Sequence, residues 1–476
     1  MRLVVIGAGL VVVAACGNDN VHHLSDGPVA DSRLIDAPAD AAIDGAPDAT
    51  PPPHFDIYAD PVNGLDTNPG TLAEPVLTLA HASAIATSGQ VIGLLDGVFR
   101  EGALPTGCDG RGIAIAPGLT LRAVHPRAAS VGNITVAVAT GSFAMVDVTI
   151  DGECTGISMS STGSDATLAL TGVQFINGGH LVLAGTVAAT IDPGTIVGSM
   201  TTDVGFGFAT LTQGAQLAIH GGTLDGGSAT TQCNPPLFEI ANTSQLALDG
   251  VTVKNFSGAG IVLAQQATAV LDDQTVFDHV AYVTGCAGGI VLNGDGGGGS
   301  TTALTMTDAT IQNSPTVAIV LRSAATATLK LTNVTVTGVA SGIRFLTAEG
   351  SSVSLDMVGS HVTNTTATAI DIEPSSASAV TATITNSTIT GNAQGLAFAT
   401  GPGSTIAIAG STIQNTGTGI TLGGGTAITA TALGDTWTAN QQAADAAGHY
   451  TDGTDVTTAT GSGLNFVITN GSTLDL

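Results

Sequence analysis

The stretch that decides the fold is Leu331-Thr-Asn-Val-Thr-Val-Thr-Gly338, followed closely by Gly342-Ile343. It is one copy of a repeated unit with an apolar residue first, usually threonine fifth, an apolar residue sixth and Asn, Gly or Asp eighth. The starts lie about 26 residues apart on average, a period typical of solenoids. The twelve copies begin at Met145, Leu170, Ile191, Ile219, Leu248, Leu271, Met306, Leu331, Met357, Ile384, Ile408 and Leu433.

Each repeat has room for two or three short strands separated by tight turns, and none for a helix. Stacked coils place equivalent strands about 4.8 Å apart, and alternation sends one side chain into the bore and the next outward. Parallel crossovers are right-handed. The sequence therefore predicts an all-β fold, a single-stranded right-handed parallel β-helix of about twelve coils.

Two columns of the repeat have predicted places in the coil. The eighth position marks a corner, where Asn and Gly tolerate a left-handed backbone, and in the unit from Leu271 this position is Asp278. The fifth position forms an outward threonine column, which includes Thr275 and is interrupted by His361 and Trp437.

The charge balance excludes one class of partner and disfavours another. The 476 residues contain 10 Lys+Arg against 37 Asp+Glu, a net charge of −27. Nucleic-acid binding needs a cationic surface, which this chain lacks. Polyanionic polysaccharides would be repelled unless divalent cations bridge them, so a neutral polysaccharide fits better.

The N-terminus predicts export and a lipid anchor. Residues 1–15 form a basic start and an apolar run too short to span a bilayer, as in a signal peptide. Val13-Ala14-Ala15-Cys16 resembles the lipobox of bacterial lipoproteins, which implies lipidation of Cys16. An ordinary secretory signal with an incidental cysteine is the alternative.

Residues 16–54 scatter seven aspartates among Ala, Gly and Pro, and we expect a disordered tether. Its root-mean-square reach would be roughly 30–35 Å. The predicted location is the bacterial cell envelope, at the outer membrane or cell surface. The mature chain is expected to contact the membrane through Cys16, without a transmembrane helix.

The next segment resembles a known family. Ile57-Tyr-Ala-Asp-Pro61, Asn63-Gly64 through Thr71, and Val91 through Phe99 are similar to the opening of DUF1565-type right-handed β-helix proteins of the pectate-lyase-like superfamily. That family usually has Tyr where Phe99 stands. The resemblance implies a short capping helix at 77–87. It says little about reaction, because the superfamily includes lyases, hydrolases, epimerases and adhesins.

These features divide the chain into segments. We expect the cap and first coils at 55–130, the repeats at 131–440 and a C-terminal cap at 441–476, with closing strands near Asn465–Ile468 and Leu474–Leu476.

Four further cysteines, Cys108, Cys154, Cys233 and Cys286, predict disulfides in an exported chain. Three pairings exist; we favour Cys233–Cys286 with Cys108–Cys154, because the loops holding Cys233 and Cys286 project over a short intervening coil. Their spacing does not indicate zinc.

Two charged sets are candidates for chemistry. The catalytic candidates are Asp272, Asp273, Asp278 and His279, since outward carboxylates serve as calcium ligands or as an acid/base pair. Alternation, however, separates Asp272 from Asp273, and only Lys254 could replace the arginine base of pectate lyases. The ligand-binding candidates are Lys254, Arg322, Lys330 and Arg344, beside Asp249, Asp308 and Asp356. Solvated ion pairs are the competing interpretation.

The sequence thus favours a surface-tethered β-helix lipoprotein that acts as a binding or structural module for polysaccharide. The alternative is a carbohydrate-active enzyme, either a calcium-assisted lyase or a two-carboxylate glycoside hydrolase. No resident metal or cofactor is expected, and Ca²⁺ is expected only for a lyase. The pairs Thr335/Thr337 and Thr388/Thr390 also resemble ice-binding arrays, but the interrupted column argues against that function.

Overall fold

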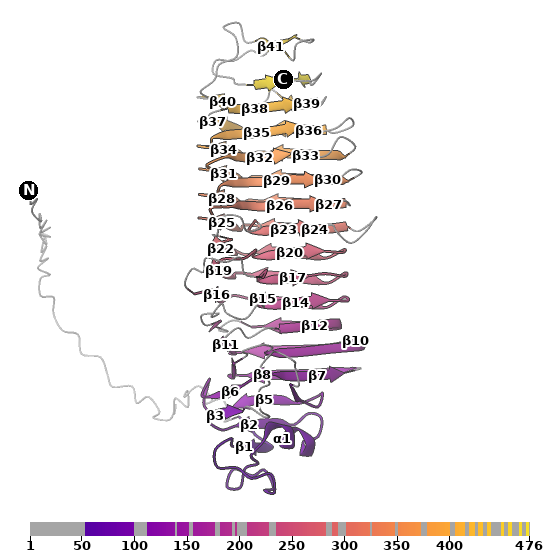
Figure 1. Ribbon diagram of the computed structural model, residues 1–476, viewed down its shortest axis with the longest axis vertical. Helices are drawn as coiled ribbons and strands as arrows, with labels where there is room; N and C mark the ends of the chain where they lie inside the picture. The colour runs from indigo at the N-terminus through magenta and orange to yellow at the C-terminus, as the bar shows by residue number, and fades with distance from the viewer. Residues whose placement is uncertain are drawn as a thin grey trace, which may run out of the picture. The chain divides into compact units, whose positions relative to one another are not determined.

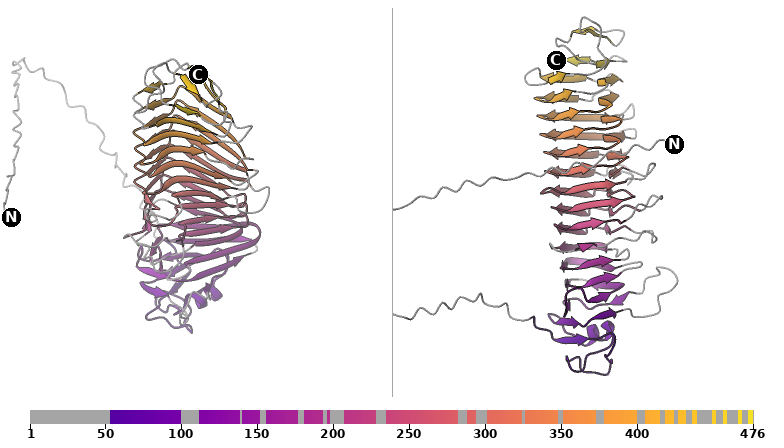
Figure 2. Two further views of the ribbon diagram at one scale, coloured as in Figure 1. Left: turned by 45° about the horizontal axis from the view of Figure 1, so that its top comes forward. Right: turned by 90° about the vertical axis from the view of Figure 1, so that its left-hand side faces the viewer.

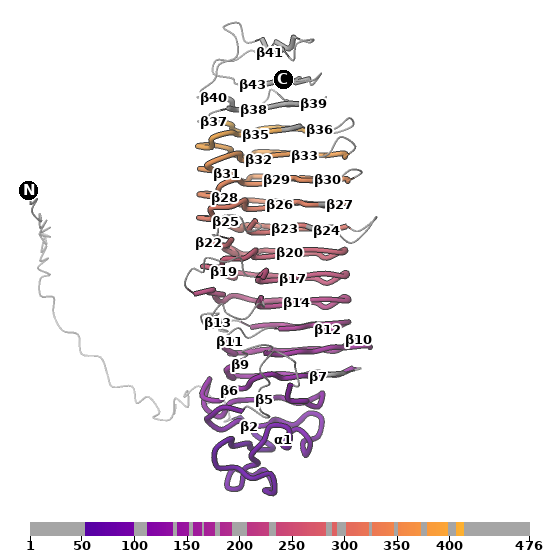
Figure 3. The backbone as a smooth tube through the Cα atoms, in the orientation of Figure 1, coloured from indigo at the N-terminus to yellow at the C-terminus, as the bar shows by residue number. Residues whose placement is uncertain are grey.

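The chain divides into two compact units, Met1–Pro53 and His54–Leu476, of which the second is the β-helix. A computed structural model describes the residues that Figure 3 draws in colour and some strands beyond them. The described residues are 53–99, 112–138, 140–151, 156–176, 181–192, 196–197, 207–227, 235–281, 288–293, 301–323, 326–347, 351–372, 378–399, 405–414, 418–423, 427–431, 436–438, 449–451, 456–458, 466–468 and 473–475.

Each coil contributes strands to three stacks of parallel strands, called here the first, second and third sheets (Figures 1 and 2). The first sheet contains β4 (Ile113–Ala114), β7 (Ile134–Val138), β10 (Ile157–Thr171), β12 (Leu181–Ile191), β14 (Ala209–Thr212), β17 (Phe238–Ile240), β20 (Ile261–Ala264), β23 (Ile290–Asn293), β26 (Val317–Ser323), β29 (Ser341–Thr347), β32 (Thr368–Ile372), β35 (Gln394–Ala399), β38 (Thr418–Gly423) and β43 (Phe466–Ile468).

The second sheet follows the first along each coil. β10 and β12 run through both sheets and join them into one hydrogen-bonded system of 28 strands. Its other strands are β1 (Ile57–Ala59), β2 (Val91–Leu94), β5 (Thr120–Ala123), β8 (Gly141–Val146), β15 (Gln216–His220), β18 (Gln245–Asp249), β21 (Thr268–Asp272), β24 (Thr301–Thr307), β27 (Thr326–Thr332), β30 (Ser352–Val358), β33 (Ala379–Thr385), β36 (Thr405–Ala409), β39 (Ala427–Thr431) and β44 (Thr473–Asp475).

The third sheet closes the coil and has 14 strands within the described residues. They are β3 (Gly97–Phe99), β6 (Ala129–Val131), β9 (Thr149–Asp151), β11 (Gln174–Ile176), β13 (Ile196–Val197), β16 (Thr223–Asp225), β19 (Thr252–Phe256), β22 (Val276–Val280), β25 (Thr310–Gln312), β28 (Thr335–Thr337), β31 (His361–Thr363), β34 (Thr388–Thr390), β37 (Thr412–Gln414) and β40 (Thr436–Thr438). The predicted all-β parallel β-helix is confirmed. All twelve repeat units supply a strand here, and β3 and β6 precede them.

Strict alternation builds the core. In β30, Val353, Leu355 and Met357 are buried while the residues between them face outward. Equivalent aliphatic side chains of successive coils lie in register and fill the bore, so each coil packs mainly against the coil before it and the coil after it. Along the bore, the rings of Phe175, Phe208 and Phe238 pack edge to face from one coil to the next.

The lower end in Figure 1 is closed by the cap, residues 54–99, which includes α1 (Leu79–Ile85). Thr78 begins this helix by accepting a hydrogen bond from the His81 amide at 3.1 Å. The Asp66 carboxylate accepts bonds from the Leu77 and Thr78 amides and the Thr78 hydroxyl. The helix implied for 77–87 is therefore present, slightly shorter. No helix within the described residues is long and apolar enough to cross a membrane.

At the other end, β43 pairs with β38 and β44 pairs with β39, so the two closing segments continue the stack. An antiparallel pair, β41 (His449–Thr451) and β42 (Val456–Thr458), precedes both closing strands in the sequence.

Register corrects three sequence-based placements. His279, with φ of +52°, occupies the corner place opposite Asn255, so placing Asp278 there was wrong. Thr275 is buried and lies inside the coil, because the preceding corner holds two left-handed residues, Asp273 and Gln274, where most corners hold one.

Trp437 is the third correction. Its backbone pairs in register with Ile413, and Thr436 pairs with Thr412, so Thr436 and not Trp437 takes the register position of the threonine column. The last unit begins at Ala430, which pairs with Ile408, and not at Leu433.

Candidate functional site

The four predicted catalytic residues do not form one group. Asp272 ends β21 on the outer side of the second sheet, and Asp273 lies in the following turn with φ of +47°. Asp278 lies on β22, on the outer side of the third sheet, and His279 stands at the far corner of that sheet. The corner between β21 and β22 therefore separates Asp272 from Asp278, and the two carboxylates lie on different sheets.

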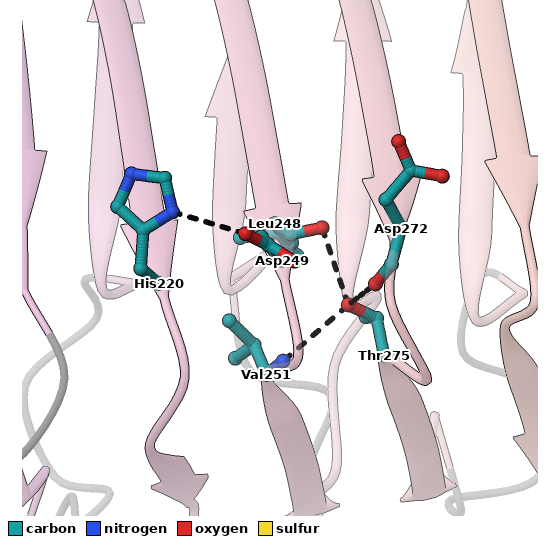
Figure 4. A network of polar contacts seen from close by, with 6 residues as sticks. All are labelled: His220, Leu248, Asp249, Val251, Asp272 and Thr275. Atoms are coloured by element: carbon teal, nitrogen blue, oxygen red, sulfur yellow. Dashed lines mark hydrogen bonds and ion pairs between the residues drawn. The ribbon is translucent and has the colours of Figure 1, made fainter.

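Asp272 belongs instead to a row on three successive coils. His220, Asp249 and Asp272 end β15, β18 and β21, and their backbones pair in register. His220 Nδ1 lies 3.2 Å from Asp249 Oδ2, and both side chains are nearly half exposed. Figure 4 shows this pair and the Asp272 carboxylate, which is directed away from Thr275. This row is called the histidine–aspartate row below.

Thr275 holds the corner beneath this row. Its hydroxyl lies 2.7 Å from the Asp272 carbonyl oxygen and 3.2 Å from that of Leu248, and the Val251 amide approaches it at 3.4 Å (Figure 4). The hydroxyl has one hydrogen to donate to these carbonyls and accepts from the Val251 amide, so it connects the corners of two neighbouring coils. Its role is to support the strand ends that carry Asp249 and Asp272.

Asp278 is part of a structural column on the third sheet. Asp225, Lys254 and Asp278 pair in register, and Lys254 Nζ lies 3.2 Å from Asp225 Oδ2. Asp278 Oδ1 accepts a hydrogen bond from the side-chain Nδ2 of Asn313 at 2.8 Å and lies 2.8 Å from His279 Nδ1. These partners occupy the carboxylates of this column.

Burial opposes ionisation of Asp225, but hydrogen bonds outweigh it. Asn255, Gly227 and Lys254 all donate to this carboxylate, and together they hold its pKa below the ordinary value. Asp225 is therefore a stable anion and not a proton donor near neutral pH.

The four basic candidates also separate. Lys254 lies on the third sheet, Lys330 on the second and both Arg322 and Arg344 on the first. Arg344 Nε lies 3.1 Å from Asp371 Oδ2; the carboxylate is buried, whereas the Arg344 side chain is 38% exposed, so the ion pair is partly open to solvent. Lys330 pairs in register with Asp356 on the next coil.

The predicted disulfide cysteines, Cys108, Cys154, Cys233 and Cys286, lie outside the described residues, as does Cys16. In the described segments, no three His, Cys, Asp or Glu side chains are placed to hold a metal ion together.

A third surface lies on the C-terminal coils. From β25 to β37 the outward positions of the third sheet carry hydroxyl and amide side chains, with one imidazole, and this surface is called the threonine face. It comprises Thr310, Gln312, Thr335, Thr337, His361, Thr363, Thr388, Thr390 and Thr412. The Thr363 hydroxyl lies 3.0 Å from that of Thr337, which links neighbouring coils.

The threonine face contains no Asp, Glu, Lys or Arg, although the same two columns contain Asp225, Lys254 and Asp278 in earlier coils. A chain of net charge −27 thus presents, over five described coils, a surface without carboxylate, lysine or arginine side chains.

Sequence reasoning did not identify His220 as part of a site, and it grouped Asp249 with the basic residues. A signal was available. Ile219, Leu248 and Leu271 are aligned unit starts, so the residues that follow them, His220, Asp249 and Asp272, share one column.

Comparison with known proteins supports the fold. The family described as "Right handed beta helix region" matches residues 237–413 and, in a second alignment, 288–460. No curated protein matches. Among solved structures, the complex of XylC with xylose is 9% identical, with 75% of each chain covered and a TM-score of 0.34.

Two other solved structures also align with the chain. A mannuronan C-5 epimerase A-module from Azotobacter vinelandii is 13% identical, with 83% of this chain and 93% of that chain covered and a TM-score of 0.32. A GH136 lacto-N-biosidase from Eubacterium ramulus is 11% identical, with 74% and 64% covered and a TM-score of 0.25. At these identities the likeness concerns the fold alone.

Proposed function

Starting from a right-handed parallel β-helix, we propose that the chain is a lipid-anchored rod at a bacterial surface that binds a neutral polysaccharide along the threonine face. The observation that carries this proposal is the absence of Asp, Glu, Lys and Arg from the threonine face of a strongly acidic chain. The anchor is Cys16, at the start of the Asp- and Pro-containing segment 16–54.

The threonine face suits a long, uncharged and repetitive ligand. Each coil presents two outward hydrogen-bonding side chains, and the coils repeat every 4.8 Å or so along the rod. Threonine hydroxyls and Gln312 both donate and accept hydrogen bonds, as sugar hydroxyls do. Because each such bond contributes only about 0.5–1.5 kcal/mol, useful affinity requires many repeats, which a polymer provides.

The test compares two sets of hydroxyl deletions on the same sheet. Thr337→Val, Thr363→Val and Thr390→Val, combined, remove three hydroxyls while retaining β-branched residues that suit a strand. At about 0.5–1.5 kcal/mol each, we expect a loss of at least tenfold in affinity for the neutral polysaccharide that a glycan array identifies. Thr223→Val with Thr252→Val, on earlier coils, is the matched control and should bind normally.

Unchanged binding by the triple variant, or an equal loss in the control, would show that the ligand lies elsewhere. Thermal hysteresis by the purified chain would favour ice binding instead, although the exposed His361 interrupts the array that ice would contact. Robust glycan depolymerisation by the wild type would replace a binding function with catalysis.

One observation favours a second candidate, a two-carboxylate glycoside hydrolase. Asp249 and Asp272 face outward in register on adjacent coils, where the strand spacing places their backbones about 4.8 Å apart. Retaining hydrolases hold their two carboxyl groups about 5–5.5 Å apart. His220 would orient Asp249 as the nucleophile, and Asp272 would act as the acid.

This candidate predicts that Asp249→Asn and Asp272→Asn each abolish release of reducing ends from glycans. Asp225→Asn, which removes a carboxylate from the neighbouring sheet, should retain that activity. If the wild type releases no reducing ends from any glycan it binds, with or without Ca²⁺, the hydrolase is ruled out.

A further inference from the structure

Exposed large apolar side chains concentrate at one end of the β-helix. Of the six such side chains among the described residues, five lie in the cap and the sixth, Val270, lies on β21. The five are Val62, Leu65, Leu72, Ile85 and Val98, and the first three are 71%, 58% and 58% exposed. Exposed apolar side chains that concentrate in one part of a surface mark a candidate interaction site.

Hydrogen bonds fix the turns that carry the three most exposed side chains. The Asp60 carboxylate accepts bonds from the amides of Val62 and Asn63, at 2.8 and 3.0 Å. Leu65 donates to the Pro75 carbonyl, and Gly70 donates to the Glu74 carbonyl across the turn that holds Leu72. The apolar rim, defined as Val62, Leu65 and Leu72, is therefore held outward by an ordered backbone.

The cap is also where the N-terminal segment joins the β-helix. Fifty-three residues precede His54, and the chain enters the cap through β1. If Cys16 is lipidated, the lipid is tied by covalent continuity to this end of the rod and not to any later coil. A linker of about 38 residues keeps the cap at a high effective concentration near the bilayer.

We propose that the apolar rim docks the cap onto the lipid surface, so that the rod stands on the membrane by its N-terminal end. This inference rests on the proposed lipid anchor at Cys16. Three side chains bury too little area to hold a protein on a bilayer alone. The lipid at Cys16 supplies the attachment, so the apolar rim needs only to orient a cap that is already held beside the surface.

The charge of the cap predicts which lipids it prefers. Asp56, Glu74 and Asp96 flank the apolar rim in sequence, and Glu74 is exposed. Anionic headgroups repel such a surface, and salt screens the repulsion. Docking should therefore be strongest on zwitterionic vesicles, weaken when phosphatidylglycerol is added at low salt, and recover at high salt.

The test uses the full lipidated chain in phosphatidylcholine vesicles that contain brominated acyl chains, which quench nearby tryptophan. Leu72→Trp places a probe on the apolar rim. Val270→Trp places one at a similarly exposed apolar site on β21, and the wild type gives the signal of Trp437. We expect the fluorescence that Leu72→Trp adds to that of Trp437 to be quenched at least twofold. The fluorescence that Val270→Trp adds should not be quenched.

Flotation with the vesicles separates failure of the anchor from failure of the docking. A chain that floats without quenching at Leu72→Trp overturns the docking and leaves the anchor intact. Equal quenching at both probes means that the rod lies on its side, and this result also overturns the proposed docking by the cap. A chain that does not float overturns the anchor and this inference with it. If the apolar rim cross-links to a second copy of the chain and the Leu72→Trp signal is not quenched, the rim is a dimer contact and not a membrane contact.

Discussion

At the scale of single residues, the corners decide how closely two coils approach. After the second sheet, Asn333, Gly359, Asn386 and Gly410 follow one another on successive coils, all with positive φ. A Cβ at Gly359 would lie 2.6 Å from Asn333 Oδ1, and one at Gly410 would lie 2.4 Å from Asn386 Oδ1. Each glycine thus leaves room for the asparagine side chain of the preceding coil.

This alternation makes Gly359→Ala destabilising. The left-handed backbone costs roughly 1–2 kcal/mol for a residue with a Cβ, and the displaced Asn333 side chain adds to that. Gly89→Ala is the control, because Gly89 has φ of +91° and nothing within 4 Å of an added Cβ. Urea unfolding should show a larger loss of stability at 359. Equal losses would mean that the asparagine contact is unimportant.

The same residues show what the sequence could predict. Asn and Gly at the eighth position correctly indicated corners, but the unit from Leu271 was displaced by one residue because Asp273 and Gln274 both occupy its turn. A one-residue shift exchanges inward and outward side chains. Thr275 was therefore expected outside and is buried, and Asp278 was expected at the corner that His279 occupies.

At the scale of elements, the cap helix α1 depends on a carboxylate outside it. Burial opposes ionisation of Asp66, but the bonds donated by Thr78 and Leu77 outweigh it and hold the pKa of this carboxyl below its ordinary value. A lowered folded-state pKa stabilises the cap fully above the unfolded value, about 3.9. That stabilisation is lost as pH falls through the folded pKa.

We expect the protection of the α1 amides, taken as their exchange rates relative to the intrinsic rates at each pH, to fall below about pH 4, where the unfolded form of Asp66 takes up its proton. Asp66→Asn should exchange faster at neutral pH and change less on acidification. Asp96→Asn, which alters a carboxylate paired with the exposed His125, should leave α1 unchanged. If the α1 amides of Asp66→Asn lose protection on acidification as much as those of the wild type, another group causes that loss.

At the scale of the whole β-helix, the fold was readable from the sequence, whereas the site was not. Twelve weakly similar units suffice to predict stacked coils because every unit repeats the same alternation. The histidine–aspartate row and the threonine face depend on the register between coils, which turn lengths set. His220 and Asp272 are 52 residues apart and meet in one row only because the turns between them keep that register.

This architecture also predicts how damage spreads. Each coil contacts its two neighbours, so stability should behave as a sum of coils and interfaces rather than as one cooperative core. Leu355 is 2% exposed on β30 and pairs in register with Leu329 on β27 and Ala382 on β33. Leu355→Ala should cost about 2–5 kcal/mol locally, as cavities in packed cores do.

Hydrogen exchange can locate that loss. Amides of β27, β30 and β33 should exchange faster in Leu355→Ala, while those of β2 and β5, which pair with each other near the cap, should keep their protection. Ser354→Ala changes the outward neighbour on the same strand and should leave all five strands unaffected. Uniform loss of protection from β2 to β33 would mean that the rod unfolds as a single unit, because a disturbance confined to neighbouring coils cannot reach the cap.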